Sequence, residues 1–358
     1  MSSANSSVVE TGVPKKKKHR FARFMAWFFG IILGLEIILR LFGYGSYVLY
    51  QPDPELLWVP VPGSHKITET NHLPININDE GFRYPRNVSQ QHDGIYRVMT
   101  FGDSVTMGWG VSDDATYSLQ LEKVLNGGGC GGKRVEVIDG GVNAYPNALA
   151  AARLKKSIVD NYQPDAVVLA YAFNTGFEKF AELQGKDREQ FLHRVEMKSV
   201  ARRSALYNFL IEDLLRQVMY YRFRELLLQG SWDTAKQHQV IDVDKFTAGL
   251  TQAKQAADSH HAQMVLLLLG SEGETSPAHP YQKAMQQFAQ QNNVPIVDMI
   301  AWQNGKNQKG FFMDHVHPTA EGHALIAQQI ASTMQGLDSY KAACQDAQSG
   351  SMVMSKQQ

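Results

Sequence analysis

The sequence predicts an α/β protein of three layers, in which helices cover both faces of a mostly parallel five-stranded sheet and one transmembrane helix precedes them. Short apolar runs alternate with longer segments of helical periodicity along most of the 358 residues. Strands that are apolar almost throughout are typical of a parallel sheet covered on both faces. A basic stretch followed by a long apolar stretch near the N-terminus predicts the membrane helix.

The N-terminal part divides into a basic tail, 1–23, and an apolar segment, 24–50. The apolar segment is long enough to cross a bilayer, which takes about 20 residues as a helix. Basic residues stay on the cytoplasmic side, so we expect the rest of the chain on the periplasmic or extracellular side of the inner (cytoplasmic) membrane. The alternatives are a nuclear address in PKKKKHR and a cleaved signal peptide, although no small-residue cleavage site follows the apolar stretch.

Two charged residues interrupt the apolar segment. Glu36 and Arg40 are four residues apart, which places them on one helix face, where they can pair with each other or with a partner helix. The formal net charge of the chain is zero, and a run of basic residues lies beside the apolar segment. This distribution favours attachment to a membrane over the binding of nucleic acid.

A linker and a folded domain are expected after the anchor. The linker, 51–94, is rich in Pro, Asn and Asp, which suits irregular structure with short edge strands. Within the domain, 95–340, strands are predicted at 96–101, 135–139, 166–172, 264–270 and 295–299, and helices at 117–125, 147–161, 244–260, 280–291 and 319–334.

A long insertion, at about 176–243, separates the third predicted strand from the fourth. Its charged amphipathic pattern predicts a helical cap, which either shapes a substrate groove over the strand ends or packs on the core. Residues 341–358 are expected to form a flexible tail. Cys130 and Cys344 are too few for a disulfide scaffold and lack the partners of a zinc site, and the sequence leaves open whether they pair.

The candidate nucleophile is a serine at the end of the first predicted strand. In VMTFGDSVTMGWG, Ser104 directly follows the apolar run, and open parallel sheets bind ligands at the carboxyl ends of their strands. A serine hydroxyl is a weak nucleophile that needs a base and a group orienting that base. The sequence FFMDHVHPTAEG places Asp314 and His317 in one loop before the last helix, where His317 can accept the serine proton and Asp314 can orient the imidazole.

Attack of a serine on an acyl carbonyl produces an oxyanion, which needs hydrogen-bond donors. The loops after the second and third predicted strands offer the backbone N–H of Gly141 in IDGGVNAY and the side-chain amide of Asn174 in AYAFNTG. Asp103 is expected to brace the serine loop through backbone hydrogen bonds. Trp109 and Tyr145 lie near this site in sequence and either contact the substrate or pack in the core.

The histidines near the C-terminus do not predict a metal site. His315 and His317 form a His-x-His pair, but no carboxylate or cysteine cluster completes a set of ligands. His315 is therefore expected to be a loop side chain and His323 a packing residue of the last helix. We expect neither a metal nor a cofactor.

Four short blocks resemble the SGNH (GDSL-type) hydrolase family, which contributes a serine, a glycine, an asparagine and a histidine in this order. The matching blocks are FGDSVTMG, GGVNAY, YAFNTG and DHVHP, and they follow successive predicted strands. The resemblance covers roughly 96–333, and with the upstream DEGFR the chain looks like bacterial members tethered to a membrane. It implies a flavodoxin-like fold, with an oxyanion hole formed by the N–H groups of Ser104 and Gly141 and the amide of Asn174.

The blocks also depart from the family pattern. Leu or a similar apolar residue usually follows the serine, and an Asn and a second Gly are common in the glycine block. A Gly usually stands two residues before the asparagine, and an Asp usually follows it. The residues at these positions are Val105, Asp139, Ala144, Ala172 and Thr175.

These observations predict a membrane-anchored serine esterase that removes ester-linked acyl groups, with O-acetyl groups on envelope or secreted glycans as the preferred substrate. The same acyl-enzyme chemistry also serves an acyltransferase, a lipid esterase or a thioesterase, and the substrate is accordingly an acylated small molecule, glycan or lipid. A glycan-binding protein without catalytic turnover is the alternative from another class. The intact Ser104, Asp314 and His317 argue against that alternative.

Overall fold

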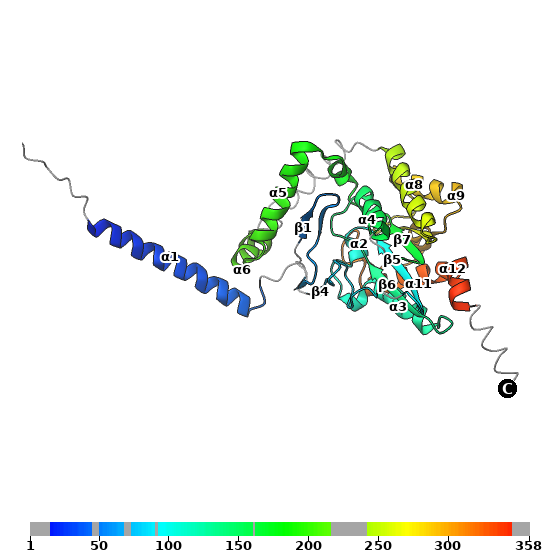
Figure 1. The fold of residues 1–358 in the computed structure, drawn as a ribbon, viewed down its shortest axis with the longest axis horizontal. Coiled ribbons are helices and arrows are strands. Elements are labelled where there is room, and N and C mark those ends of the chain that lie inside the picture. Colours follow the sequence, from blue (N-terminus) through cyan, green and yellow to red (C-terminus); the bar gives the residue numbers. More distant parts are fainter. Residues whose placement is uncertain are drawn as a thin grey trace, which may run out of the picture.

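A computed structural model describes residues 15–44, 50–67, 73–89, 92–159, 162–215 and 242–345. The first element, α1 (Lys15–Leu41), projects away from the other elements (Figure 1). Within it, His19–Leu41 is long and apolar enough to cross a membrane, and none of its most apolar stretch is buried inside the protein. The N-terminal apolar helix expected from the sequence is therefore present.

The helix α1 ends earlier than the predicted segment, 24–50. Gly43 adopts a left-handed conformation with φ of +83°, and the N–H groups of Gly43 and Tyr44 donate to the carbonyls of Arg40 and Leu39. This arrangement satisfies the last carbonyls of a helix and requires a residue that tolerates positive φ, most often glycine. Gly43 thus sets the C-terminal end of α1, and hydropathy alone does not reveal this end.

The central sheet has five parallel strands, as predicted. Their order is β6-β5-β7-β8-β9, so β5 lies between β6 and β7. The chain adds a strand on one side of β5 and then continues on the other side, which creates the switch point where open α/β sheets bind ligands. The strands are β5 (Ile95–Phe101), β6 (Arg134–Asp139), β7 (Ala166–Ala170), β8 (Gln263–Leu268) and β9 (Ile296–Asp298).

Helices cover both faces of this sheet, because alternate side chains of a strand point to opposite faces. In β5, Met99 and Phe101 pack in one apolar cluster, whereas Tyr96 and Val98 pack in the other. One layer contains α4 (Asn147–Val159), α8 (Val243–Ser259) and α9 (Pro280–Gln291). The opposite layer contains α3 (Tyr117–Gly127), α11 (Ala320–Met334) and α12 (Asp338–Tyr340), and the short α10 (Met299–Gln303) follows β9. The three-layer architecture is confirmed.

Two antiparallel hairpins precede the sheet in the chain. They are β1 (Tyr50–Asp53) with β2 (Leu57–Pro60), and β3 (His65–Ile67) with β4 (Pro74–Asn76). Residue 50, which the sequence placed in the membrane segment, is the first residue of a strand. The linker therefore contains regular edge structure, and it contributes buried side chains such as Leu56, Leu57 and Trp58.

The described part of the insertion is helical. It contains η2 (Thr175–Glu182), α5 (Gly185–Ala201), α6 (Ala205–Tyr207) and η3 (Asn208–Leu215), whereas 216–241 lie outside the described residues. Its helix α5 packs against the first hairpin, where Phe191 joins Trp58 and Tyr145 in a separate apolar cluster. The first hairpin and the insertion thus pack against each other through this cluster.

The two cysteines, whose pairing the sequence left open, form a disulfide. Cys344 lies in η4 (Lys341–Gln345) and is buried, and Cys130 lies in the loop after α3. The folded part of the chain therefore continues beyond residue 340, where the flexible tail was expected to begin. Residues 346–358 of that tail lie outside the described residues.

Candidate active site

Ser104 is the first residue of α2 (Ser104–Met107), a short helix that directly follows β5. The turn between strand and helix is so tight that a Cβ at Gly102 would lie 2.1 Å from the hydroxyl oxygen of Thr106. A glycine is therefore required at position 102. This turn places the serine at the carboxyl end of β5, where the sequence predicts the site.

Asp314 and His317 lie in a loop whose two sides are joined by backbone hydrogen bonds. Phe312 and Pro318 form an isolated bridge across the loop, and the Met313 N–H donates to the carbonyl of His317 at 2.8 Å. A short bridge of this kind brings both predicted partners of the serine to one place. The loop leads into α11, which begins after the capping residue Thr319.

The structure brings the three predicted side chains into one hydrogen-bonded series. The Ser104 Oγ is 2.9 Å from His317 Nε2, and His317 Nδ1 is 2.8 Å from Asp314 Oδ2. Because the Asp314 carboxylate accepts the Nδ1–H, the Nε2 of a neutral imidazole is left as an acceptor for the serine proton. The sequence separation between Ser104 and His317 is 213 residues, so only the fold can create this contact.

The charge of Asp314 is stabilised locally. Burial alone would raise the pKa of this carboxyl, but hydrogen bonds from the His317 ring and from the backbone N–H groups of His317 and Val316 lower the pKa to about 2. The carboxylate is therefore ionised throughout the neutral and mildly acidic range. It is available to hold the imidazole in one orientation and to stabilise a positive charge there.

Trp109 lies against the other side of the imidazole. Its ring centroid is 4.3 Å from that of His317, with the two planes tilted by 39°. The sequence left open whether Trp109 contacts the substrate or packs in the core. Its partner is the imidazole, which this contact holds in place and which an aromatic face favours when it carries a positive charge.

Asp103 joins the serine loop to the asparagine loop. Its Oδ1 accepts the Val105 N–H at 3.0 Å, and its Oδ2 accepts the Phe173 N–H at 2.8 Å and the Asn174 amide at 3.1 Å. The side chain is buried, and burial raises its pKa to about 6 despite these hydrogen bonds. Asp103 therefore braces two loops, in keeping with the structural role expected from the sequence.

The backbone N–H of Gly141, predicted to face the oxyanion, already has a partner. It donates to Asp139 Oδ1 at 2.9 Å, and the other oxygen of this buried carboxyl accepts the hydroxyl of Ser118 at 2.9 Å. Burial raises the pKa of Asp139 to about 7. A Cβ at Gly141 would lie 2.3 Å from the Met107 nitrogen, so this glycine is required for close packing against α2.

Another residue of the same loop, Ala144, was not among the predicted donors. It stands in the left-handed region with φ of +64°, a conformation unusual for a residue with a Cβ. Among the described residues, no partner of the Ala144 N–H is found. The sequence offered one signal, since this alanine occupies a position where the family pattern often has glycine.

The side chain of Asn174 lies between the serine loop and the glycine loop. Its Nδ2 donates to Asp103 Oδ2 at 3.1 Å and to the Tyr145 carbonyl at 3.3 Å. Tyr145 itself is buried, and its hydroxyl donates to the Trp58 carbonyl at 2.6 Å. Tyr145 is thus a core residue, and its backbone contributes to the position of Asn174.

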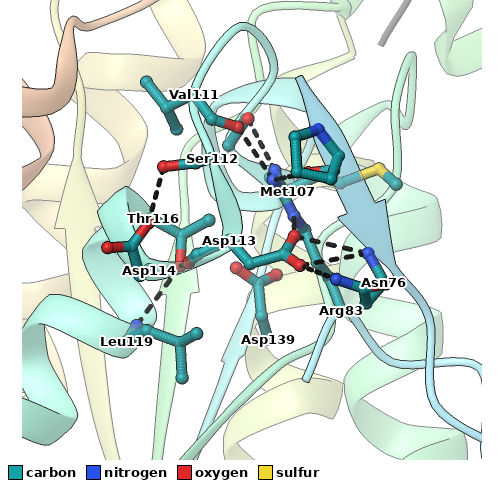
Figure 2. A network of polar contacts seen from close by, with 12 residues as sticks. Asn76, Arg83, Met107, Val111, Ser112, Asp113, Asp114, Thr116, Leu119 and Asp139 are labelled. Atoms are coloured by element: carbon teal, nitrogen blue, oxygen red, sulfur yellow. Dashed lines mark hydrogen bonds and ion pairs between the residues drawn. The ribbon is translucent and has the colours of Figure 1, made fainter. Parts of the chain in front are cut away.

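Sequence reasoning missed Arg83, a fully buried cation that contacts the end of α2, the helix that Ser104 begins. Figure 2 shows the guanidinium surrounded by oxygen atoms from the loop after α2. Its Nη1 donates to the carbonyls of Met107 and Gly108, both at 2.6 Å, its Nη2 to the carbonyl of Val111 at 2.8 Å, and its Nε to Asp113 at 2.7 Å. Arg83 therefore holds the end of α2 in place through hydrogen bonds to its last carbonyls. The signal in the sequence was DEGFR, noted only as part of a resemblance.

The remaining predicted residues lie away from this chemistry. His323 is buried in α11, where its Nδ1 accepts the Tyr117 N–H at 3.1 Å and burial lowers its pKa to about 3. His315 is exposed, and its carbonyl accepts the Glu272 N–H. In the part of the chain that the structure describes, no group of three or more His, Cys, Asp or Glu side chains is arranged to hold a metal ion.

A cavity of about 530 Å³ lies between α4, η2 and α8. Its walls include Ala148, Glu178, Lys245 and Phe246, but none of the three hydrogen-bonded residues at the serine. Glu178 accepts the backbone N–H groups of Asn147 and Ala148 and so caps the start of α4. This cavity is separate from the candidate active site.

The sequence matches the model of the GDSL-like lipase/acylhydrolase family over residues 100–325, more than half of the chain. This match shows that the protein is an enzyme of the class that hydrolyses ester bonds. It belongs to the GDSL-like lipase/acylhydrolase family, as the four blocks of the sequence suggested. No curated protein sequence matches the chain.

Several solved structures are similar to this chain at low sequence identity. A lipase/acylhydrolase from Enterococcus faecalis is 16% identical, with a TM-score of 0.43, and the match covers 67% of this chain and 95% of that one. The esterase EstA from Pseudoalteromonas sp. is 14% identical, with a TM-score of 0.41 and coverages of 67% and 97%. An acetyl xylan esterase, AlAXEase, is 17% identical, with a TM-score of 0.42 and coverages of 66% and 98%.

Proposed function

We propose that this esterase is anchored in the inner (cytoplasmic) membrane and uses Ser104, His317 and Asp314 as a catalytic triad on the periplasmic or extracellular side. The observation that carries the proposal is the unbroken series of hydrogen bonds from Ser104 Oγ through the imidazole to the Asp314 carboxylate. A serine so connected has both the base and the orienting group that nucleophilic catalysis needs.

The proposed reaction proceeds in two steps. The Ser104 Oγ attacks the acyl carbon while His317 Nε2 takes its proton, and the same imidazole then gives the proton to the departing alkoxide. The alcohol leaves, and the acyl group remains on Ser104. A water molecule then attacks this ester with His317 again as base, which releases the carboxylic acid and restores the serine.

The oxyanion hole is proposed to involve the N–H of Ser104, the N–H of Gly141 and the amide of Asn174. The Gly141 N–H donates to Asp139, so it can serve an oxyanion only by exchanging that bond. The N–H of Ala144, which has no partner among the residues that the structure describes, lies in the same loop and is the alternative backbone donor. Asn174 contacts Asp103, the neighbour of the nucleophile, which supports a position beside the reacting carbonyl. Its amide also donates to the Tyr145 carbonyl, so it too serves an oxyanion only by exchanging one of these bonds.

The proposed substrates are small ester-linked acyl groups, above all O-acetyl groups, on envelope or secreted glycans. The argument is one of location, because basic residues that precede the apolar part of α1 favour a domain outside the cytoplasm. The disulfide between Cys130 and Cys344 supports this orientation, since such bonds form and persist in oxidising compartments. Labelling of a cysteine introduced near residue 60 from outside intact cells tests the orientation, and protection of that cysteine would overturn it.

The function is tested with the full chain and two kinds of reagent. A fluorophosphonate probe is expected to label the wild-type protein and not Ser104→Ala. Hydrolysis of p-nitrophenyl esters is expected to be fastest for acetate and to fall with chain length, and release of acetate from an O-acetylated glycan is expected to exceed transfer to an added sugar acceptor. A preference for long chains would overturn the glycan substrate, and predominant transfer would make the enzyme an acyltransferase.

A further inference from the structure

The insertion carries an exposed apolar surface that the proposed reaction does not explain. Outside α1 and the residue that follows it, nine large hydrophobic side chains of the described residues are exposed, and six of them lie between residues 197 and 215. These six are Met197, Val200, Leu210, Ile211, Leu214 and Leu215. Such a concentration is unusual for a surface in contact with water and marks an interaction site.

This apolar surface begins at the candidate membrane span. Figure 1 shows α6 beside the C-terminal end of α1. The Glu36 carboxylate of α1 accepts the hydroxyl of Ser204 and the backbone N–H groups of Ala205 and Leu206, all at 2.9 Å. The side chain of Arg40 donates to the carbonyl of Arg203 at 2.7 Å.

These contacts explain the two charges inside the apolar segment. Glu36 pairs with Arg40 and at the same time supplies acceptors for the first N–H groups of α6, which have no partner within the helix. A carboxylate in a membrane segment is tolerated where it is paired and hydrogen-bonded. Glu36 and Arg40 therefore attach the start of residues 204–215 to the span, and we call this pair the docking point.

The docking point fixes the height of these residues relative to the membrane. Glu36 is five residues before the end of the candidate span, His19–Leu41, which corresponds to about 7.5 Å along a helix. Phe209 packs edge-on against Tyr44, just beyond the end of α1, with ring centroids 5.5 Å apart. Residues 204–209 thus extend from inside the span to its outer end, the level at which aromatic residues concentrate in membrane proteins.

We propose that residues 204–215, referred to below as the docking segment, lie in the outer boundary of the lipid bilayer beside α1. This inference rests on the proposed anchoring by α1. Leu210, Ile211, Leu214 and Leu215 enter the acyl region, as the apolar side chains of interfacial helices do. A single helix would leave the domain free to turn on its linker, whereas this second contact gives the active site a fixed orientation above the membrane.

The experiment uses the full chain in phosphatidylcholine and phosphatidylglycerol vesicles, with an NBD fluorophore on a cysteine introduced at Leu210 or Leu214. Phe29→Cys in α1 reports the bilayer, and Lys283→Cys on the exposed side of α9 reports water. We expect acyl-brominated lipids to quench Leu210→Cys and Leu214→Cys nearly as strongly as Phe29→Cys. Aqueous iodide is expected to quench Lys283→Cys alone.

Three results would overturn the inference, and they separate it from the proposed anchor. Quenching of positions 210 and 214 by iodide, with Phe29→Cys quenched by brominated lipid, would place the docking segment in water and leave the anchor standing. Quenching of positions 210 and 214 by neither reagent would mean that protein covers the surface. If brominated lipid fails to quench Phe29→Cys, both the anchor and the inference fail.

A matched pair of variants tests the docking point itself. Glu36→Gln is expected to reduce quenching of position 210 by brominated lipid and to increase quenching by iodide, because the amide cannot replace both carboxylate oxygens as acceptors. Glu189→Gln, at an exposed position of α5, is expected to change neither. Hydrolysis of a soluble ester serves as the folding control for both variants. Unchanged quenching in correctly folded Glu36→Gln would contradict the docking role of Glu36.

Discussion

The imidazole of His317 contacts three different groups, and each contact has its own consequence. Ser104 is hydrogen-bonded to Nε2, Asp314 is hydrogen-bonded to Nδ1, and the Trp109 ring packs against the imidazole ring. The hydrogen bonds determine which nitrogen accepts a proton, and the indole limits how far the ring can move. The base of the proposed reaction is therefore oriented before any substrate arrives.

The role of Asp314 can be tested by a change that keeps its shape. Asp314→Asn removes the charge that selects the tautomer and stabilises the imidazolium, so kcat for p-nitrophenyl acetate is expected to fall by about 100-fold to 10,000-fold. Asp244→Asn, at an exposed position of α8, is the control and is expected to leave kcat unchanged. A kcat within a factor of about two of wild type in Asp314→Asn would remove this residue from the triad.

The role of Asn174 predicts a loss of kcat with little change in KM. Asn174→Ala removes the side-chain amide of the proposed oxyanion hole, and loss of such a donor typically costs about 100-fold to 1,000-fold in kcat. Steady-state kinetics with a soluble acetyl ester measure both parameters. An increase in KM with unchanged kcat would instead show that the amide contributes to ground-state binding.

At the scale of secondary-structure elements, the site depends on short connections braced by buried polar groups. The helix α2 is held at its start by Asp103 and at its end by Arg83. A buried polar group is costly without partners, so these networks specify one geometry of the serine turn.

Arg83 is predicted to act as a positioning residue. Arg83→Lys keeps the charge but cannot reach the three carbonyls and Asp113 together, so we expect a loss of roughly 2 kcal/mol or more in the free energy of unfolding. We also expect kcat to fall several-fold more than KM changes, because the serine turn loses its support. Thermal unfolding and steady-state kinetics on one preparation measure both effects.

The control for Arg83 lies three residues further along the chain. Arg86 is partly exposed and pairs with Glu122, so Arg86→Lys is expected to change stability little and kcat not at all. If Arg83→Lys unfolds more easily but keeps its kcat at low temperature, Arg83 is structural and does not position the nucleophile.

The carboxyl of Asp139 predicts a pH-dependent stability. Burial raises its pKa in the folded state from 3.8 to about 7, so the protonated form favours folding, and this contribution is lost as the pH rises through about 7. Asp139→Asn stays neutral at all pH values and retains an acceptor for the Gly141 N–H. Its melting temperature minus that of wild type is therefore expected to increase from pH 4 to pH 8. A difference independent of pH would contradict the shifted pKa.

At the scale of the whole molecule, the disulfide joins two parts of the folded domain that are far apart in the sequence. It links the loop after α3 to η4, across a sequence separation of 214 residues. A crosslink over so long a stretch removes many conformations from the unfolded chain. Cys344 belongs to the same apolar cluster as Tyr340 and Met334, so the crosslink also holds η4 on the core.

Removal of the disulfide is predicted to lower stability and to leave the reaction intact. Cys130→Ser combined with Cys344→Ser is expected to cost roughly 2–5 kcal/mol in the free energy of unfolding. Activity on a soluble ester at low temperature should remain within a factor of about two of wild type, because neither cysteine contacts the site. Unfolding in denaturant measures the first effect. Equal stability of the variant and the oxidised wild type would contradict it.

The sequence by itself determined the sheet, its flanking helices, the N-terminal apolar helix and the three hydrogen-bonded side chains of the candidate site, Ser104, His317 and Asp314. Each follows from a local pattern: apolar strands alternating with amphipathic segments, or short polar blocks directly after strands. Such patterns depend on neighbours in the sequence, and they are readable without coordinates. The end of α1 was misplaced because one glycine, and not hydropathy, terminates that helix.

Only the tertiary structure decided which distant groups meet. Arg83 lies in a hairpin-rich linker and His317 near the C-terminus, yet both contact the short segment after β5. The path of the chain likewise decides which group accepts the Gly141 N–H and how α5 packs on the first hairpin. It also decides that residues 204–215 begin at Glu36. Contacts between residues far apart in sequence arise from the packing of whole elements, and no local pattern encodes them.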